Sequence, residues 1–310
     1  MIKKTDLAII GGGIAGVSAA VYARRAGLDF TLFEGGSIGG QIMLMESVDN
    51  YVGVDVGTKS ADLIGKLSAT LDALDIIPVS ENVSRIVIRN NAAALYSDNA
   101  TYEARCVILA AGASFKQLGA KGEKEFAGRG VSYCAVCDGY FFRDKDVAVI
   151  GGGNTAVEEA LYLANICRKV YLVHRRDKLR AMDYLQKELA AKPNVEIIYN
   201  SSVDQIKGAD FVEGILLTDA VACKTRMVAV SGVFVAVGVL PSSGLVKDLV
   251  KLDEQGFILT DDGLKTSCGL VWACGDCRKR PLRQLITAAS EGALAALGAY
   301  HYLQGDYISA

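Results

Sequence analysis

Two cysteines that stand two residues apart, Cys134 and Cys137, carry the chemistry that this sequence suggests first. A C-x-x-C pair can close a small disulfide ring, and pairing can lower the pKa of one thiol until a thiolate is available near neutral pH. Asp138 follows directly, and its carboxylate can carry the proton that each exchange step moves. C-x-x-C is also half of a common zinc site, so the spacing alone leaves that alternative open. The position of the pair, between two glycine-rich loops, favours reversible dithiol–disulfide exchange.

The first glycine-rich loop lies near the N-terminus and predicts a dinucleotide site. A predicted strand over residues 7–10 leads into it and a predicted helix over residues 17–25 leaves it, with Gly11, Gly13 and Gly16 spaced as G-x-G-x-x-G. Gly11 makes the tight turn, Gly13 lets the backbone approach a pyrophosphate, and Gly16 lets the helix pack closely on the strand. Because strand, loop and helix follow in the required order, a glycine-rich turn without a ligand is a poor alternative.

A carboxylate ends the next predicted strand of this first motif. Glu34 closes the strand at residues 30–34, where an acid accepts hydrogen bonds from an adenosine ribose. The glycine-rich segment 35–41 follows, which suggests backbone lying against a ligand, with a flexible loop as the alternative. The acid-ended motif therefore suits FAD.

A second loop of the same kind, residues 151–156, follows the cysteines. Ala156 takes the third glycine position, a replacement that still allows close packing of helix and strand. The next predicted strand, residues 169–173, ends in His174-Arg175-Arg176 instead of an acid. Cations at this position suit a 2′-phosphate, so this motif predicts NADPH in preference to NADH. A solvated charged loop is the alternative.

The composition fits a globular protein of two domains. The chain has 310 residues, of which 51% are hydrophobic and 22% charged, which excludes a disordered chain. A formal net charge of -2 gives no bulk attraction to nucleic acid or to an anionic membrane. The longest apolar run, residues 227–240, is interrupted by serine and glycine and is too short to span a membrane. We expect a buried strand of a parallel sheet there.

The cysteine content points to a reducing compartment. The N-terminus leads directly into a strand without the apolar segment of a secretory signal, so we expect a cytoplasmic protein whose eight cysteines are mostly thiols. Four of them stand apart from any motif and are expected to be buried and unreactive: Cys106, Cys167, Cys223 and Cys268.

The joint set of motifs resembles the bacterial low-molecular-weight thioredoxin reductases, essentially from end to end. The segments that carry the resemblance are residues 11–16, 134–139, 151–160 and 174–177. The resemblance implies an α/β fold with two Rossmann-like three-layer nucleotide-binding domains, the NADPH domain being inserted into the FAD domain. It places the first part of the FAD domain at residues 1–113, the NADPH domain with the redox cysteines at 114–241, and the second part of the FAD domain at 242–310.

The resemblance also implies a homodimer with one FAD per chain that acts on thioredoxin or a thioredoxin-like disulfide protein. Electrons would pass from NADPH to FAD, to the Cys134–Cys137 disulfide and to oxidised thioredoxin. Cys137 is implied to lie against the flavin, Cys134 to attack the disulfide of thioredoxin, and Asp138 to act as acid and base. The residues implied to hold FAD are Gly11, Gly13, Ile14, Ala15, Gly16, Glu34, Gly35, Gly39, Gly40, Gln41, Asn50, Val83, Ala111, Gly112, Gly275, Asp276, Arg283, Gln284 and Leu285. Those implied to hold NADPH are Gly151, Gly152, Gly153, Asn154, Thr155, His174, Arg175, Arg176, Arg180, Val237 and Gly238.

Among the departures from the family pattern, two could form a further site. Cys274 and Cys277 form a second C-x-x-C around Gly275 and Asp276. Because that Gly-Asp pair is already implied in flavin binding, we interpret the two thiols as incidental, with an auxiliary redox or metal pair as the alternative; no metal site is expected. The turn at residues 278–281 is unusually basic. A solvated turn is the commoner case, and a surface for a partner or a phosphate is the alternative.

Three other functions stay open at this point. The same motifs would serve a flavin disulfide reductase with another thioredoxin-like client. Ferredoxin as the electron donor is disfavoured because the second glycine loop and its arginines are intact. A non-catalytic flavoprotein that senses redox state is disfavoured because Cys134, Cys137 and Asp138 are all present.

Overall fold

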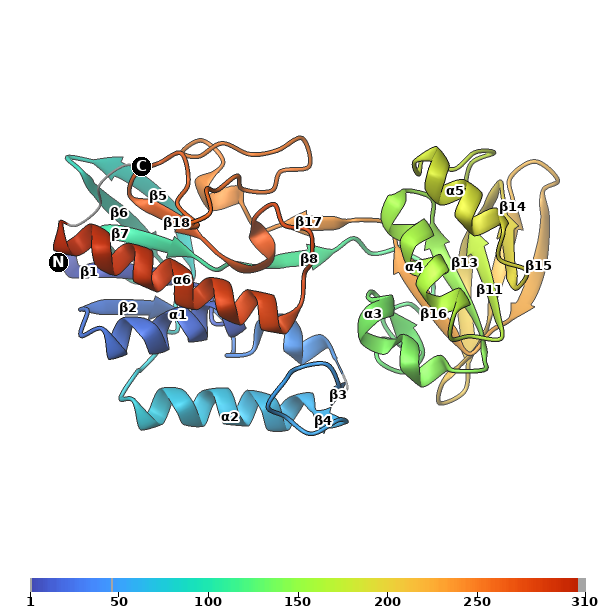
Figure 1. Ribbon diagram of the computed structural model, residues 1–310, viewed down its shortest axis with the longest axis horizontal. Helices are drawn as coiled ribbons and strands as arrows, with labels where there is room; N and C mark the ends of the chain where they lie inside the picture. The colour runs from blue at the N-terminus through green and yellow to red at the C-terminus, as the bar shows by residue number, and fades with distance from the viewer. Residues whose placement is uncertain (1, 46, 306–310) are drawn as a thin grey trace. The chain divides into compact units, whose positions relative to one another are not determined.

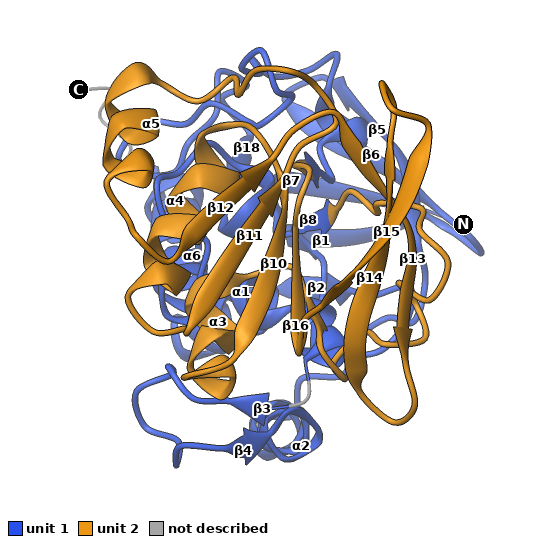
Figure 2. Cartoon of the chain, turned by 90° about the vertical axis from the view of Figure 1, so that its right-hand side faces the viewer, with its two compact units in different colours: residues 1–114, 240–310 blue, residues 115–239 orange. Residues whose placement is uncertain are grey.

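The chain forms two compact units in the computed structural model, which describes residues 2–45 and 47–305. One unit comprises Met1–Ser114 and Leu240–Ala310, and the other comprises Phe115–Val239 (Figure 2). The chain passes between them twice, through the strands β8 (Ala113–Phe115) and β17 (Val239–Pro241), which pair with each other (Figure 1). The second unit is therefore inserted into the first.

The first unit is built on a six-stranded sheet with a parallel centre. Its parallel strands are β1 (Ile2–Ile10), β2 (Phe30–Phe33), β7 (Thr101–Leu109) and β18 (Val271–Ala273), and β5 (Val83–Arg89) and β6 (Ala92–Ser97) extend the sheet in the antiparallel sense. Along β1, Leu7 and Ile9 join the core on one face while Ala8 and Ile10 join the core on the other. Burial on both faces explains why this strand reads as an uninterrupted apolar run.

Two helices that lie far apart in the sequence cover one face of this sheet (Figure 1). α1 (Ile14–Arg25) follows the first glycine loop, and α6 (Leu285–Gln304) ends the fold. A Cβ on Gly292 of α6 would lie 2.1 Å from the carbonyl oxygen of Ala15, so the two backbones touch. This contact holds the C-terminal segment against the first glycine loop. The remaining elements are α2 (Ser60–Ala73), β3 (Ser47–Val48), β4 (Thr58–Lys59) and the short 3-10 turns η1 (Gly40–Leu44), η3 (Gly244–Val246) and η4 (Gly275–Cys277).

The second unit has three layers around a five-stranded parallel sheet. The strand order is β12 (Val195–Ile198), β11 (Lys169–Val173), β10 (Asp146–Gly151), β16 (Gly232–Ala236) and β9 (Val131–Ser132). One face packs against α3 (Ala135–Asp138), α4 (Asn154–Ala164) and α5 (Asp183–Ala190), with the turn η2 (Gly139–Phe142) after α3. The other face packs against an antiparallel sheet of β13 (Ser201–Gly208), β14 (Val212–Asp219) and β15 (Lys224–Ala229). The predicted α/β class with two Rossmann-type parallel sheets is confirmed.

The buried parallel strand expected within residues 227–240 is β16, but this strand fills only part of the apolar run. This run contains the end of β15, which is antiparallel and carries a half-exposed Met227, then the whole of β16, and then the start of β17. Only β16 lies in the parallel sheet. Gly238, with φ +123°, ends that strand in a conformation that L side chains rarely adopt, so the apolar run cannot continue as one strand. Within the described residues, no helix is long and apolar enough to cross a membrane.

Candidate active site

Cys134 and Cys137 form a disulfide at the start of a short helix. Their Cα atoms lie 5.3 Å apart, and the backbone N–H of Cys137 points at the Sγ of Cys134, 3.2 Å away. Both cysteines are half-buried, whereas Ala135 between them is fully buried and Val136 is about half exposed. One face of α3 is therefore anchored in the core while the disulfide stays near solvent.

A buried serine holds the carboxylate of Asp138 beside the disulfide. The hydroxyl of Ser132 donates to Oδ2 of Asp138 at 2.5 Å and accepts from the backbone N–H of Cys134 at 3.1 Å. One side chain thus links the predicted acid–base group to the first cysteine. Sequence reasoning missed Ser132, although its place two residues before Cys134 was a signal that it could reach the pair.

The second glycine loop has close backbone contacts at its start and an open surface at its end. A Cβ on Gly151 would lie 2.4 Å from the carbonyl oxygen of Ala236, and one on Gly152 would lie 2.3 Å from Nδ1 of His174. No atom lies within 4 Å of a Cβ built on Gly153. The loop is pressed against the sheet at two glycines and leaves the N-terminus of α4 accessible, as a phosphate site requires.

The basic residues that follow β11 differ in their exposure. Arg175, Arg176 and Arg180 are exposed, and the backbone N–H of Arg180 donates to the carbonyl of Gly152 at 2.7 Å. His174 is buried, and burial, followed by the charge of Arg180, lowers its pKa, so the positive charge of this segment at neutral pH comes from the arginines and the exposed Lys178. Of the other residues predicted to hold NADPH, Asn154 and Thr155 begin α4, and Val237 and Gly238 follow β16.

The first glycine loop is closed by Glu34 as well as by close backbone packing. Oε2 of Glu34 accepts from the N–H of Gly12 at 2.6 Å, and Oε1 accepts from the N–H of Gly36 at 2.8 Å. A Cβ on Gly40 would lie 3.0 Å from Cα of Gly13, so segment 35–41 runs against the first loop. The carboxylate stands at the carboxyl end of β2, where the sequence placed it.

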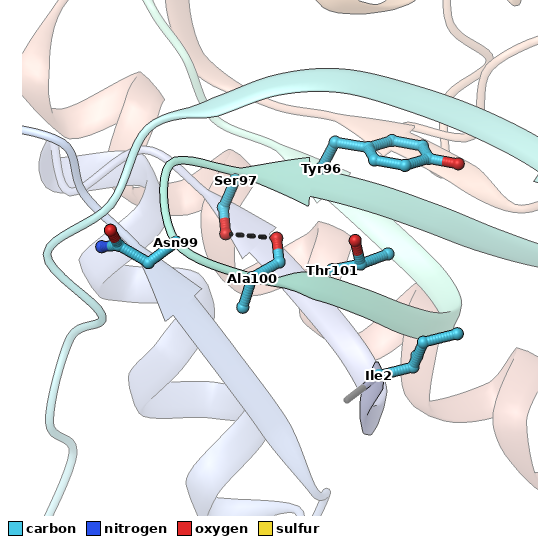
Figure 3. Close-up of a pocket in the computed structure, with 6 residues that line it drawn as sticks. All are labelled: Ile2, Tyr96, Ser97, Asn99, Ala100 and Thr101. Atoms are coloured by element: carbon cyan, nitrogen blue, oxygen red, sulfur yellow. Dashed lines mark hydrogen bonds between the residues drawn. The ribbon is translucent and has the colours of Figure 1, made fainter.

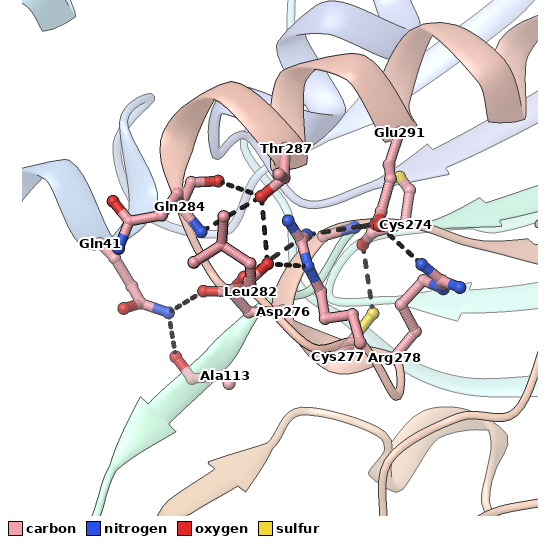
Figure 4. A network of polar contacts seen from close by, with 12 residues as sticks. Gln41, Ala113, Cys274, Asp276, Cys277, Arg278, Leu282, Gln284, Thr287 and Glu291 are labelled. Atoms are coloured by element: carbon pink, nitrogen blue, oxygen red, sulfur yellow. Dashed lines mark hydrogen bonds and ion pairs between the residues drawn. The ribbon is translucent and has the colours of Figure 1, made fainter. Parts of the chain in front are cut away.

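Several residues that the sequence assigned to FAD follow the carboxyl ends of β1, β7 and β18, and Figure 4 shows Gln41, Asp276 and Gln284 among them. Nε2 of Gln41 donates to the carbonyl of Ala113 at 2.8 Å and to Oδ2 of Asp276 at 3.2 Å, and Nδ2 of Asn50 donates to Oε1 of Gln284 at 3.0 Å. Ala111 and Gly112 follow β7, and Leu285 begins α6. Val83 lies apart from these groups, at the start of β5 and buried in the core.

Two buried polar atoms in this cluster have no hydrogen-bond partner within the described part of the chain. They are Oδ1 of Asp276 and Nε of Arg283. Burial is the main cause that raises the pKa of Asp276 and lowers that of Arg283. The guanidinium of Arg283 stacks on Phe257, 4.1 Å from the ring centroid. Buried polar groups are normally satisfied, so these two atoms are candidates for contact with a ligand.

The expectation of a solvated basic turn at residues 278–281 is wrong for Arg278 and Arg280. Their side chains are only 16% and 2% exposed, and both pair with Glu291 of α6, at 2.6 and 3.2 Å. Arg280 also approaches Asp276 at 3.6 Å, and Glu291 accepts from the N–H of Gly275 at 2.8 Å. Sequence reasoning missed Glu291, which lies more than ten residues further along the chain.

Cys274 and Cys277 are free, buried thiols, which favours the interpretation that they are incidental. Both are fully buried, but they belong to the cores on opposite faces of the sheet. Burial raises the pKa of Cys277 to about 12, which makes it unreactive. Among the residues that the structure describes, no cluster of His, Cys, Asp and Glu could hold a metal. The expectation for the isolated cysteines holds for Cys106 and Cys167 and is wrong for Cys223, which is exposed, and for Cys268, which is half-buried.

A surface pocket of the first unit lies away from all of these residues (Figure 3). It sits at the turn from β6 to β7, at the end of β7 opposite to Ala111 and Gly112. Its lining residues are Ile2, Tyr96, Ser97, Asn99, Ala100 and Thr101. This lining offers no carboxylate, thiol, imidazole or cation, so the pocket is not the active site.

We expect Glu291→Gln to lower the free energy of unfolding by about 3–5 kcal/mol, because it leaves the buried Arg280 and Arg278 without their anion. Glu103→Gln is the matched control: its partner Lys4 is 78% exposed, and loss of such a pair costs at most about 1 kcal/mol. Denaturant unfolding of both variants measures the difference. Equal effects of the two substitutions would show that the network around Glu291 is not stabilising.

The matches to known proteins extend over both units of the chain. The profile of the pyridine nucleotide-disulphide oxidoreductase family matches residues 5–292. The thioredoxin reductase of Peptoclostridium acidaminophilum is 39% identical over 308 residues, which cover 97% of this chain and 98% of that protein. The thioredoxin reductase of Bacillus subtilis is 39% identical over 309 residues, covering 97% and 96%. The crystal structure of thioredoxin reductase from Streptococcus pyogenes has a TM-score of 0.94 at 41% identity, covering 98% of this chain and 100% of that one.

Proposed function

The chain belongs to the pyridine nucleotide-disulphide oxidoreductase family, together with the thioredoxin reductases, and from this premise we propose that it is an NADPH-dependent thioredoxin-disulfide reductase. Electrons pass from NADPH to FAD, to the Cys134–Cys137 disulfide and to oxidised thioredoxin. The observation that carries the proposal is the disulfide itself, held beside a fixed carboxylate in the same compact unit as the arginine-rich glycine loop.

The residues of the first unit fit FAD. Gly11 and Gly40 leave no room for a side chain between backbone segments, as a loop against a pyrophosphate needs. The unpartnered atoms of Asp276 and Arg283 supply an acceptor and a donor at the carboxyl edge of the sheet. Bound there, FAD would supply the two-electron chemistry that links a nicotinamide to a disulfide. We propose residues 1–113 and 242–310 as the FAD domain and residues 114–241 as the NADPH domain.

The reduced cysteine pair performs two successive exchange steps. The thiolate of Cys134 attacks one sulfur of the client disulfide, forms a mixed disulfide and releases the other client sulfur as a thiolate that takes up a proton. The thiolate of Cys137 then attacks the sulfur of Cys134, which restores the Cys134–Cys137 disulfide and releases the second client thiolate. Asp138 takes the proton of the attacking thiol and returns it to the leaving sulfur, and Ser132 keeps its carboxylate in place.

Several finer points of the proposal rest on the resemblance to thioredoxin reductases. They are the action on thioredoxin, the homodimer with one FAD per chain, and the cytoplasmic location. The exposed Val136, Tyr140 and Phe141 next to the disulfide give a protein client apolar surface to bind.

We expect Cys134→Ser and Cys137→Ser to abolish NADPH-dependent reduction of thioredoxin, because each removes one sulfur of the exchange. Asp138→Asn should lower the turnover by about 10²-fold, since a positioned acid–base group typically contributes 10²–10⁴-fold. Cys223→Ser, at an exposed cysteine outside the site, is the matched control and should turn over as the wild type does. Retained turnover in either cysteine variant of the pair would refute the proposed route.

Arg176→Ala should lower kcat/KM for NADPH by about 10- to 100-fold, which corresponds to the 1.5–3 kcal/mol of a hydrogen bond to a charged group. The value for NADH should stay unchanged, because NADH lacks the 2′-phosphate. Arg168→Ala is the matched control, since Arg168 precedes β11, at the opposite end from Arg176, and pairs with Asp146 at the surface. Equal kinetics of wild type and Arg176→Ala with NADPH would mean that Arg176 belongs to a solvated loop and does not bind the 2′-phosphate.

A further inference from the structure

A buried carboxyl group lies directly beneath the redox helix and has no part in the exchange steps described above. Glu159 is on α4, and its Oε1 accepts a long hydrogen bond, 3.5 Å, from the backbone N–H of Ala135 between the two cysteines. Its Oε2 is shielded from solvent and has no hydrogen-bond partner within residues 2–45 and 47–305. A carboxylate with a shielded, unsatisfied oxygen costs free energy of folding, so its presence beside the redox pair calls for a functional explanation.

The fold fixes Glu159 against the cysteine pair. Gly139, directly after α3, packs so closely on α4 that a Cβ there would lie 3.0 Å from Leu163 and 3.1 Å from Tyr162. Ala135 and Ala160 are fully buried in the same core. The two helices therefore keep their spacing, which holds the backbone of Glu159 close to that of Ala135.

The surroundings of Glu159 raise its pKa into the neutral range. Burial raises the pKa of Glu159 to about 7, and the negative charges of Asp138 on α3 and Glu158 on α4 act in the same direction, while the N–H of Ala135 opposes them. Since its pKa is raised, the group is neutral and protonated below about pH 7 and ionised above.

We propose that Glu159 is a positioning residue for the redox pair, which takes up a proton when Cys134 and Cys137 are reduced and releases it when they are oxidised. It acts through the backbone of Ala135 and through its charge. The proposal rests on the redox activity of the pair in the proposed function, and it does not depend on which protein is the client.

Proton uptake by Glu159 offsets the negative charge that appears on the cysteine pair when it is reduced. Reduction breaks the S–S bond with two electrons and one proton and leaves one thiol and one thiolate. The new negative charge near Glu159 favours its protonated form, so a second proton enters from solvent and the site gains no net charge beyond that of the disulfide state. When the electrons leave on the client, the thiolate charge disappears and the carboxyl group releases that proton.

The test is the pH dependence of alkylation of Cys134 in the FAD-loaded protein after reduction with dithiothreitol and removal of the reductant. Iodoacetamide is the probe, and mass spectrometry reads Cys134 and Cys223 separately. In the wild type, ionised Glu159 opposes the thiolate above pH 7. Glu159→Gln should therefore shift the midpoint of Cys134 alkylation down by about half to one pH unit and raise the rate near pH 7.5 about three- to tenfold. Below pH 6 the two proteins should agree.

Two controls separate this role from a structural one. Glu158→Gln removes a charge from the adjacent, exposed position of α4 and should leave the Cys134 profile close to that of the wild type. Cys223 is exposed in the turn between β14 and β15 and should show one profile in all three proteins. Coincident Cys134 profiles of wild type and Glu159→Gln, or equal shifts in both variants, would overturn the proposal.

A measurement on the wild type covers the case in which Glu159→Gln fails to fold. Protein labelled with ¹³C at glutamate should show the infrared band of a protonated glutamate rising when the disulfide is reduced at pH 7.5, and the label separates this band from that of Asp138. Absence of the band would overturn the proposal. Neither assay uses NADPH or thioredoxin, so a positive result without thioredoxin turnover would reject the client alone, and turnover with a negative result would reject the role of Glu159 alone.

Discussion

The close packing of α3 on α4 is the contact on which the rest of the site depends. Gly139 allows it, because a Cβ there would lie only 3.0 Å from Leu163 and 3.1 Å from Tyr162, closer than most Cβ contacts. α3 carries the disulfide, and α4 begins at the second glycine loop. The cysteine pair and the nucleotide loop therefore belong to one rigid body, and any motion of the unit carries both. A redox pair on a separate loop would have no such fixed relation to a nucleotide.

The two units share one backbone arrangement around their glycine loops but differ in the charge of the side chain that follows. Each brings glycine backbone to the carboxyl ends of parallel strands and places a charged side chain at the end of the next strand, Glu34 in one and Arg176 with its neighbours in the other. In the first unit the buried Arg278 and Arg280 are compensated by Glu291, which ties the Gly275–Asp276 turn to α6. This turn is thereby held rigid, and Oδ1 of Asp276, which lies 3.6 Å from Arg280 but makes no hydrogen bond within the described residues, is an acceptor at the edge of the sheet.

The sequence predicted the features that depend on short-range spacing. Both glycine loops, the strand ends at Glu34 and Arg175, and the cysteine pair with Asp138 are read within about 25 residues of chain, where strand, turn and helix follow directly. Glu159 and Glu291 were not predicted, because their contacts with Ala135 and Arg280 arise when a helix packs on another element, and no motif spacing encodes that packing. The same reason explains the wrong expectations for the basic turn and for Cys223: exposure is set by tertiary contacts that local composition does not encode.

The central claim is that electrons enter from NADPH and leave through the cysteine pair to thioredoxin. Anaerobic stopped-flow absorbance of the flavin in the FAD-loaded protein tests it most directly. The account predicts fast loss of the oxidised flavin spectrum with NADPH, slow loss with NADH, and recovery when oxidised thioredoxin is added. Recovery that fails with thioredoxin would contradict the proposed client, and absence of bleaching with either nucleotide would contradict the proposed donor.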